Sequence, residues 1–189
     1  MLGFVLSLRP WLAAAALLLA GAAPAAHAQV APATLRESAV KAAFLFNFGS
    51  FVEWPAGTFG TAREPLVIGV LGEDAVAEEL EHLIQDRSIE GRSVKVRRLK
   101  DSDTGGAVHI LFAGTQRPAR LRELLHGVPG PVLVVTQQEG ALRYGSVINF
   151  VAEGSRVRFT ASLASAEARG LRLSARLLEV AQSVEGRQR

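Results

Sequence analysis

The chain has 189 residues, with 21 lysines and arginines against 18 aspartates and glutamates, and no cysteine. The missing cysteines exclude disulfide bonds, thiolate metal sites, haem attachment through cysteine and thiol redox switching. The net charge of +3 gives no support to nucleic-acid binding.

Residues 1–28 resemble a cleavable export signal. Arg9 precedes an apolar stretch, and Ala26-His27-Ala28 provides a cleavage site. A membrane anchor is the alternative. However, the 13 residues from Trp11 to Ala23 make about 20 Å of helix at ~1.5 Å per residue, against a hydrocarbon core of about 30 Å. We therefore expect a periplasmic protein whose mature chain forms a single domain.

A first helix is predicted over residues 38–52, after an N-terminal arm at residues 29–36. Thr34 and Glu37 have the spacing of a capping box, and Pro55 favours a helix end just before it. Apolar residues cover a wide arc of this helix: Val40, Phe44, Leu45, Phe46, Phe48, Phe51 and Val52. A helix wedged against a sheet accounts for the arc, and an interface with another chain, such as a homodimer, is the alternative.

From residue 66 onward, short apolar runs alternate with helical segments. The predicted strands are residues 66–71, 94–97, 108–112 and 132–136, and the predicted helices are residues 74–84, capped by Asp74, and a segment opened by Pro118. This alternation predicts an α/β domain, with a mixed, mostly parallel sheet and helices on both faces in an α/β/α sandwich.

The last third of the chain departs from this alternation. Residues 147–152 and 156–160 flank Glu153-Gly154-Ser155, a spacing that favours an antiparallel hairpin. Two helices are predicted to follow, over residues 162–169 and 174–184, the first stopped by Gly170. Residues 185–189 are expected to be a disordered tail, so the domain is predicted to span residues 37–184.

No group of residues in the mature chain has the pattern of a catalytic or cofactor site. Gly69-Val70-Leu71-Gly72 lacks the spacing of a dinucleotide-binding loop, and Glu73 and Asp74 would repel a phosphate there. His82, His109 and His126 lie on separate predicted elements, and we expect His109 to be a partly buried structural residue. We therefore expect no cofactor, no metal and no enzymatic activity.

Basic residues form three clusters, around residues 95–100, around residues 117–122 and at Arg156 with Arg158. A solvated surface accounts for them, and a binding surface for an acidic partner or for anionic lipid is the alternative.

Several segments resemble the YfiR family of periplasmic proteins. The most specific is the phenylalanine-rich stretch of residues 40–48, which continues to Glu53-Trp54-Pro55. Residues 66–72, 109–112, 148–151 and 170–178 recur in the family's order. The resemblance covers residues 37 to 184.

The resemblance implies a non-enzymatic regulator. The best-known members bind the periplasmic sensor domain of an inner-membrane diguanylate cyclase and repress it, and their release raises cyclic-di-GMP and favours biofilm. Those members carry cysteines that form disulfides, so redox control is not transferable to this chain. The partner could instead be another membrane sensor, such as a histidine kinase.

Eight residues are the candidates for contact with such a partner, from the end of the first helix and from the C-terminal region: Phe48, Phe51, Trp54, Arg156, Arg158, Leu171, Leu173 and Leu177. The alternative for each apolar candidate is a place in the core. A different functional class, a periplasmic protein that binds a small solute, stays open because an open α/β sheet has a crevice at its strand ends.

Overall fold

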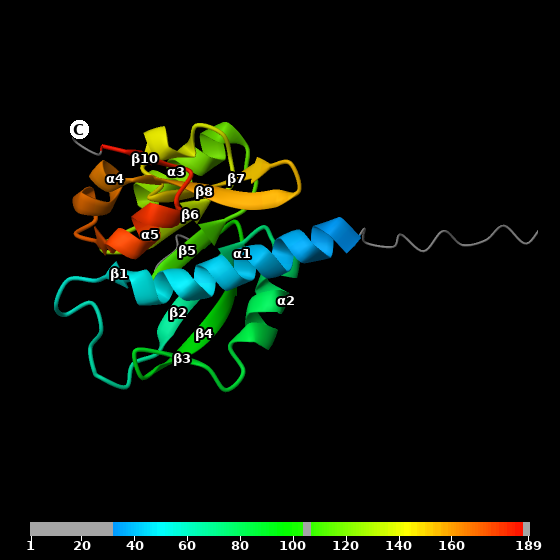
Figure 1. Ribbon diagram of the computed structural model, residues 1–189. Coiled ribbons are helices and arrows are strands. Elements are labelled where there is room, and N and C mark those ends of the chain that lie inside the picture. Colours follow the sequence, from blue (N-terminus) through cyan, green and yellow to red (C-terminus); the bar gives the residue numbers. More distant parts are fainter. Residues whose placement is uncertain (1–31, 104–106, 187–189) are drawn as a thin grey trace, which may run out of the picture.

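The structure, a computed structural model, describes residues 32–103 and 107–186 and contains an eight-stranded mixed sheet with helices on both faces (Figure 1). This confirms the α/β class predicted from the sequence. The expected signal peptide at residues 1–28 lies outside the described residues, as do residues 187–189 of the expected tail.

The helices are α1 (Pro32–Phe51), α2 (Asp74–Leu83), α3 (Pro118–Gly127), α4 (Leu163–Ala168), α5 (Ala175–Val180) and the short 3-10 helix η1 (Ala141–Tyr144). The strands are β1 (Val52–Glu53), β2 (Leu66–Leu71), β3 (Ser88–Ile89), β4 (Arg92–Leu99), β5 (Ile110–Ala113), β6 (Leu133–Thr136), β7 (Ile148–Glu153), β8 (Arg156–Ser162), β9 (Arg172–Leu173) and β10 (Ser183–Glu185). The order in the main sheet is β10-β8-β7-β6-β5-β2-β4-β3, and β1 pairs with β9 separately.

Strands β4, β2, β5, β6 and β7 run parallel to one another, whereas β7–β8 and β3–β4 are antiparallel pairs. The central strands are apolar on both sides because each side packs against helices. On β5, Ile110 and Phe112 face the core beneath α1 and α2, while Leu111 and Ala113 face the core beneath α3. The continuous apolar runs in the sequence are therefore strands that are buried on both faces.

The aromatic residues of α1 hold that helix against the β7–β8 hairpin. The Phe48 ring lies 6.0 Å from the Phe150 ring and 5.2 Å from the Phe159 ring, in stacked and edge-on geometry respectively. Phe44 makes similar contacts with both rings, at 5.9 and 5.5 Å. Two helical turns of α1 are thus fixed to the hairpin by rings that bury large areas and also attract one another.

Two predicted helix starts are wrong. Helix α1 begins at Pro32, so residues 32–36, expected as an arm, form its first turns, and Thr34 is not at the cap position. Glu37 instead pairs with Lys41 one turn later, at 2.5 Å. The N-cap of α2 is Glu73 rather than Asp74, and its side chain makes no capping hydrogen bond.

The C-terminal end also differs from the prediction. Helix α5 ends at Val180 rather than at residue 184, because the chain turns and adds β10 parallel to β8. Strand β10 includes Glu185, the first residue of the expected tail. The hairpin and the stop of α4 before Gly170, which has a φ of +70°, are confirmed.

We predict that Phe48→Ala destabilises the protein by about 3 to 5 kcal/mol, because the change leaves a cavity among well-packed rings. Urea unfolding followed by circular dichroism measures the loss. Val180→Ala is the control, because 57% of Val180 is exposed and surface changes usually cost about 0.5 kcal/mol or less. Similar losses in the two variants would contradict the role given to the ring cluster.

Candidate functional site

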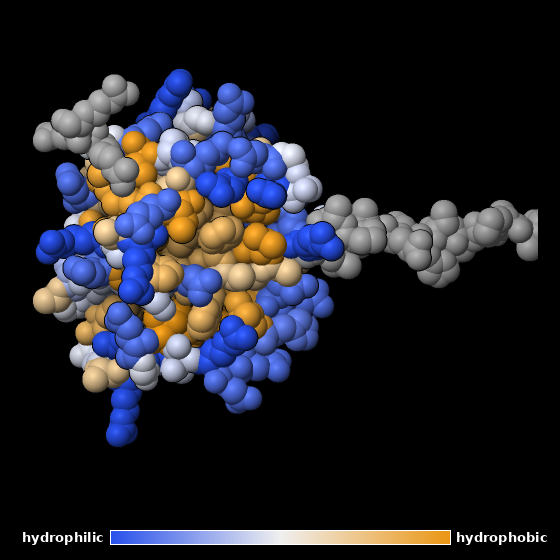
Figure 2. Space-filling view, viewed as in Figure 1, coloured by the Kyte–Doolittle hydropathy of each residue, from blue (hydrophilic) through white to orange (hydrophobic). Residues whose placement is uncertain are grey.

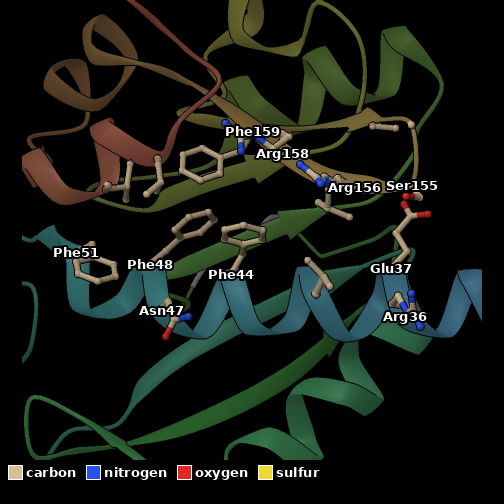
Figure 3. A pocket seen from close by; sticks show the side chains of 16 residues that line it. Arg36, Glu37, Phe44, Asn47, Phe48, Phe51, Ser155, Arg156, Arg158 and Phe159 are labelled. Atoms are coloured by element: carbon tan, nitrogen blue, oxygen red, sulfur yellow. The ribbon is translucent and has the colours of Figure 1, made fainter.

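An open groove of about 1060 Å³ lies on the surface between α1 and the β7–β8 hairpin, above the rings that join them, with α5 at one end (Figure 3). Its lining from α1 is Arg36, Glu37, Val40, Phe44, Asn47, Phe48 and Phe51, its lining from the hairpin is Ala152 and Gly154 to Phe159, and its lining from α5 is Leu177 and Val180. Figure 2 shows apolar side chains gathered on this face of the molecule. We call this feature the α1–β8 groove.

The structure brings five of the eight predicted contact residues together at this groove: Phe48, Phe51, Arg156, Arg158 and Leu177. The other three lie outside its lining. Trp54 packs edge-on against Phe59, with the ring centres 6.0 Å apart. Leu173 pairs with Val52 in the small β1–β9 sheet, and Leu171 is buried just before it.

Burial divides the apolar candidates into two groups. Phe48, Leu171 and Leu177 are core residues with at most 2% of their surface exposed. Of these, Phe48 and Leu177 also form part of the groove wall. Phe51, Trp54 and Leu173 are half-buried and keep some surface for contact.

Several groove residues were missed by the sequence analysis. The helical spacing that singled out Phe48 and Phe51 also contains Val40 and Phe44, so the periodicity held a usable signal for them. The sequence contained no such signal for Val180, because the exposure of this side chain depends on where the chain leaves α5.

The charges at the groove are unevenly compensated. Glu37 is neutralised by Lys41, which is almost fully buried and also donates to Gln137 Oε1 at 2.7 Å. Arg158 Nε lies 4.0 Å from Glu153 Oε2, has no hydrogen-bond partner and is shielded from solvent. Within residues 32–103 and 107–186 the structure shows no ion pair for Arg36 or Arg156. The groove therefore carries a net positive charge.

The other basic clusters have partners within the chain. On β4, Arg98 makes a two-pronged contact with Glu81, at 3.0 and 2.8 Å, which lowers the pKa of that carboxyl group. On α3, Arg120 pairs with Glu123 at 2.9 Å, and Arg122 lies over the Tyr144 ring. Such contacts are expected of basic side chains on a solvated surface, which is the interpretation that the sequence favoured.

At the carboxyl ends of the strands, the central position of the crevice where an α/β protein would bind a solute is occupied by the Glu73 side chain. It lies between β2 and β5, where the strand order reverses. A Cβ atom on Gly114 would lie 2.4 Å from Glu73 Cγ, so the Glu73 side chain closes this position. Gln137 Nε2 donates to Glu73 and also to Thr115 Oγ1, at 3.3 Å for the latter. The position between β2 and β5, at which an α/β protein usually binds its solute, is therefore closed by side chains of this chain.

Other features considered from the sequence have structural explanations. A Cβ atom on Gly69 would meet Leu99 and Val108 side chains at 2.9 Å, so this glycine allows neighbouring strands to pack. Among the described residues, no three histidine, aspartate or glutamate side chains are placed to hold a metal ion. No helix in the same ranges has both the length and the apolar character needed to cross a membrane.

His109 is buried and hydrogen-bonded, as predicted. Its Nδ1 accepts a hydrogen bond from the Val67 N–H at 3.0 Å. Its ring stacks on Phe59 at 4.4 Å, and the Arg92 guanidinium covers Phe59 at 4.2 Å. Burial lowers the pKa of His109, against a smaller opposing effect of Glu64, and Arg92 lowers it further.

Comparison with known proteins identifies the family. The profile of the DUF4154 family, described as YfiR/HmsC-like, matches residues 38–182. The chain belongs to the YfiR/HmsC-like family. The match includes α1 from Ser38 onward and nearly all of the main sheet, so the groove is built entirely within the YfiR/HmsC-like domain except for its first two residues, Arg36 and Glu37.

Comparisons with solved structures and with curated protein sequences give less information about this chain. A crystal structure of a conserved domain protein from Vibrio cholerae is similar over 63% of this chain, with 14% sequence identity and a TM-score of 0.43. This chain covers 54% of that protein's chain. No curated protein sequence matches the chain significantly.

We predict that acid destabilises the protein partly through His109. Its pKa is lower in the folded protein than the value of about 6.5 expected after unfolding, so the unfolded chain binds the proton more tightly. The free energy of unfolding should therefore decrease as the pH falls below about 6.5. Urea unfolding at pH 7.5 and pH 5.0 measures this decrease.

The matched variant for this measurement is His109→Asn, whose side-chain oxygen can accept the Val67 hydrogen bond but does not titrate. We expect a smaller loss of stability between the two pH values in this variant. Equal losses in the variant and the natural protein would assign the acid effect to other groups.

Proposed function

We propose that this protein is a periplasmic regulator that binds the periplasmic sensor domain of an inner-membrane diguanylate cyclase and represses cyclic-di-GMP synthesis. The YfiR/HmsC-like family supports a periplasmic regulator of diguanylate cyclase rather than an enzyme. The observation that carries the proposal to this chain is the α1–β8 groove, which joins apolar side chains to Arg36 and Arg156, arginines without an ion pair among the described residues.

The groove suits a partner better than a small substrate. Small-molecule sites bury most of the ligand surface and usually hold convergent polar groups. This groove is open to solvent, and its polar residues are spread along it: Arg36, Glu37 and Ser155 lie at one end, whereas Asn47 lies near Phe48 (Figure 3). An apolar surface with charged residues at its rim is typical of a surface that binds another protein.

Repression needs only a modest preference for one conformation of the sensor. A regulator shifts a conformational equilibrium by the difference between its affinities for the two states. A difference of about 3 kcal/mol, at the upper end of usual coupling energies, changes the populations roughly a hundredfold. An interface of ordinary size is sufficient for this.

Of the predicted contact residues, those that keep exposed surface at the groove would make the contact with the sensor. These are Phe51, Arg156 and Arg158, to which the structure adds Val180, 57% exposed. Leu173 and Trp54 lie beyond the end of α1 and would extend the contact if the partner reaches past the groove.

We predict that deleting the gene raises cyclic-di-GMP in cells that contain the partner cyclase, and that Val180→Glu fails to restore repression. A carboxylate at this exposed apolar position would prevent close packing of the partner without disturbing the core. Cyclic-di-GMP is quantified by mass spectrometry, and affinity purification from detergent-solubilised membranes identifies the bound sensor.

The matched control is Ala119→Asp, an exposed position on α3 on the opposite side of the sheet, which should restore repression fully. Unchanged cyclic-di-GMP in the deletion strain would overturn the proposed function. Recovery of a histidine kinase instead of a cyclase would keep the regulatory role and change the partner.

A further inference from the structure

The α1–β8 groove lies over the face of the β7–β8 hairpin that packs toward α1, and it also follows the outer edge of β8. Side chains of a strand point alternately to the two faces of its sheet, so a cavity over one face touches every second residue. This groove is lined by every residue from Arg156 to Phe159. Such unbroken contact arises where a cavity follows the backbone edge.

That edge of β8 is open over residues 156–159. On one side, β8 pairs with β7 from Arg156 to Ala161. On the other side, β10 pairs only with residues 160–162. Just before β10, the Gln182 N–H donates a hydrogen bond to the Phe159 carbonyl at 2.8 Å, so this carbonyl is satisfied. Among the described residues no strand lies beside the remaining part of β8.

Three backbone groups face this open side. Glu153 and Arg156 are partners across a two-residue loop, which makes them a hydrogen-bonded pair. Because bonded and non-bonded pairs alternate along an antiparallel ladder, the N–H and C=O of Val157 and the N–H of Phe159 point away from β7. Within the described chain these groups have no backbone partner in the loops and termini either.

The two sides of the open edge differ in chemistry. Val157 and Phe159 pack toward the aromatic residues of α1, among which Phe44 lies 5.5 Å from Phe159. Arg156 and Arg158 alternate to the other side, next to Glu153. The side chains of a strand bound along this edge would alternate between the same two faces. Every second side chain would contact the aromatic rings, and the others would lie beside the arginines.

We propose that the α1–β8 groove is a β-augmentation site, which binds an extended segment of the partner that alternates apolar and acidic residues. The segment would pair with Val157 and Phe159 through its backbone, place its apolar side chains on Phe44 and Phe51, and place its carboxylates beside Arg156 and Arg158. This mode of recognition takes affinity from backbone hydrogen bonds and specificity from alternate side chains. The inference rests on the proposed function, since the segment belongs to the regulated sensor.

The same charges disfavour a second copy of the chain as the occupant. If β8 paired with its own copy in antiparallel fashion about Val157, Arg156 of each chain would lie directly opposite Arg158 of the other. Like charges in directly opposed positions destabilise a strand pair. Charged residues on an exposed edge are also a common protection against unwanted self-pairing, so these arginines favour an acidic partner over a copy.

The test uses short peptides as probes. A seven-residue peptide that alternates valine and glutamate is compared with its valine–lysine counterpart and with a valine–glutamate peptide methylated on the backbone nitrogens of one edge. Peptide binding is measured by fluorescence anisotropy, and amide hydrogen exchange of the protein is measured residue by residue by NMR.

We expect the glutamate peptide to slow exchange at the Val157 and Phe159 amides at least tenfold, with little change at the Arg158 amide, which already bonds to β7. The lysine and N-methylated peptides should bind at least tenfold more weakly. Absence of protection at Val157, or equal binding by the N-methylated peptide, would overturn strand addition. Protection of Val157 without peptide, together with a dimer in solution, would identify a second copy and also overturn the proposal.

Two variants at Val157 test the strand-addition site independently of the proposed function. Val157→Pro removes the outward N–H at a position where an edge strand tolerates proline, and Val157→Thr keeps that N–H. We expect the proline variant to lose peptide binding and repression of cyclic-di-GMP, and the threonine variant to keep both. If the folded proline variant still represses, the edge is not the docking site although the regulatory function stands.

Discussion

The contact between the phenylalanines of α1 and those of the β7–β8 hairpin determines the geometry of the candidate docking face. Phe44 and Phe48 touch both Phe150 and Phe159, so α1 cannot move relative to the hairpin without loss of core packing. Three of these rings, Phe44, Phe48 and Phe159, also line the α1–β8 groove. Core and candidate docking surface are therefore continuous: Phe48, Phe150 and Phe159 are buried, whereas Phe44 is only partly buried and keeps some surface at the groove.

The polar residues at the strand ends and those at the hairpin differ in how well they are paired. At the strand ends, where α/β proteins usually bind ligands, Glu73 and Gln137 bond to each other and to neighbouring groups, and Lys41 joins them from α1. At the hairpin, in contrast, Arg156 has no ion pair within the described residues and Arg158 only a loose one. Among the described residues, weakly paired charge and backbone groups without a hydrogen-bond partner therefore lie together at the edge of β8.

The sequence by itself determined the class of fold and most elements of the main sheet. Strands β2, β5 and β6 could be predicted because burial on both faces requires continuous apolar runs, and α3 because Pro118 and three leucines mark its start and its inner face. The hairpin followed from the turn at Gly154, and the first helix from its phenylalanine stripe. All of these signals are local, since each depends on residues within one or two turns or strands.

Tertiary structure alone decided the parts on which the candidate site depends. Strands β1, β9 and β10 have two or three residues each, too few for any periodicity, and they exist because a distant strand provides their hydrogen bonds. The short length of β10 leaves β8 open, and no pattern within residues 156–159 reports it. The same is true of burial: Leu171, Leu173 and Leu177 look alike in the sequence, but packing buries two of them and leaves the third half-exposed. Local chemistry specifies which element forms, whereas long-range pairing specifies which of its edges and faces remain uncovered.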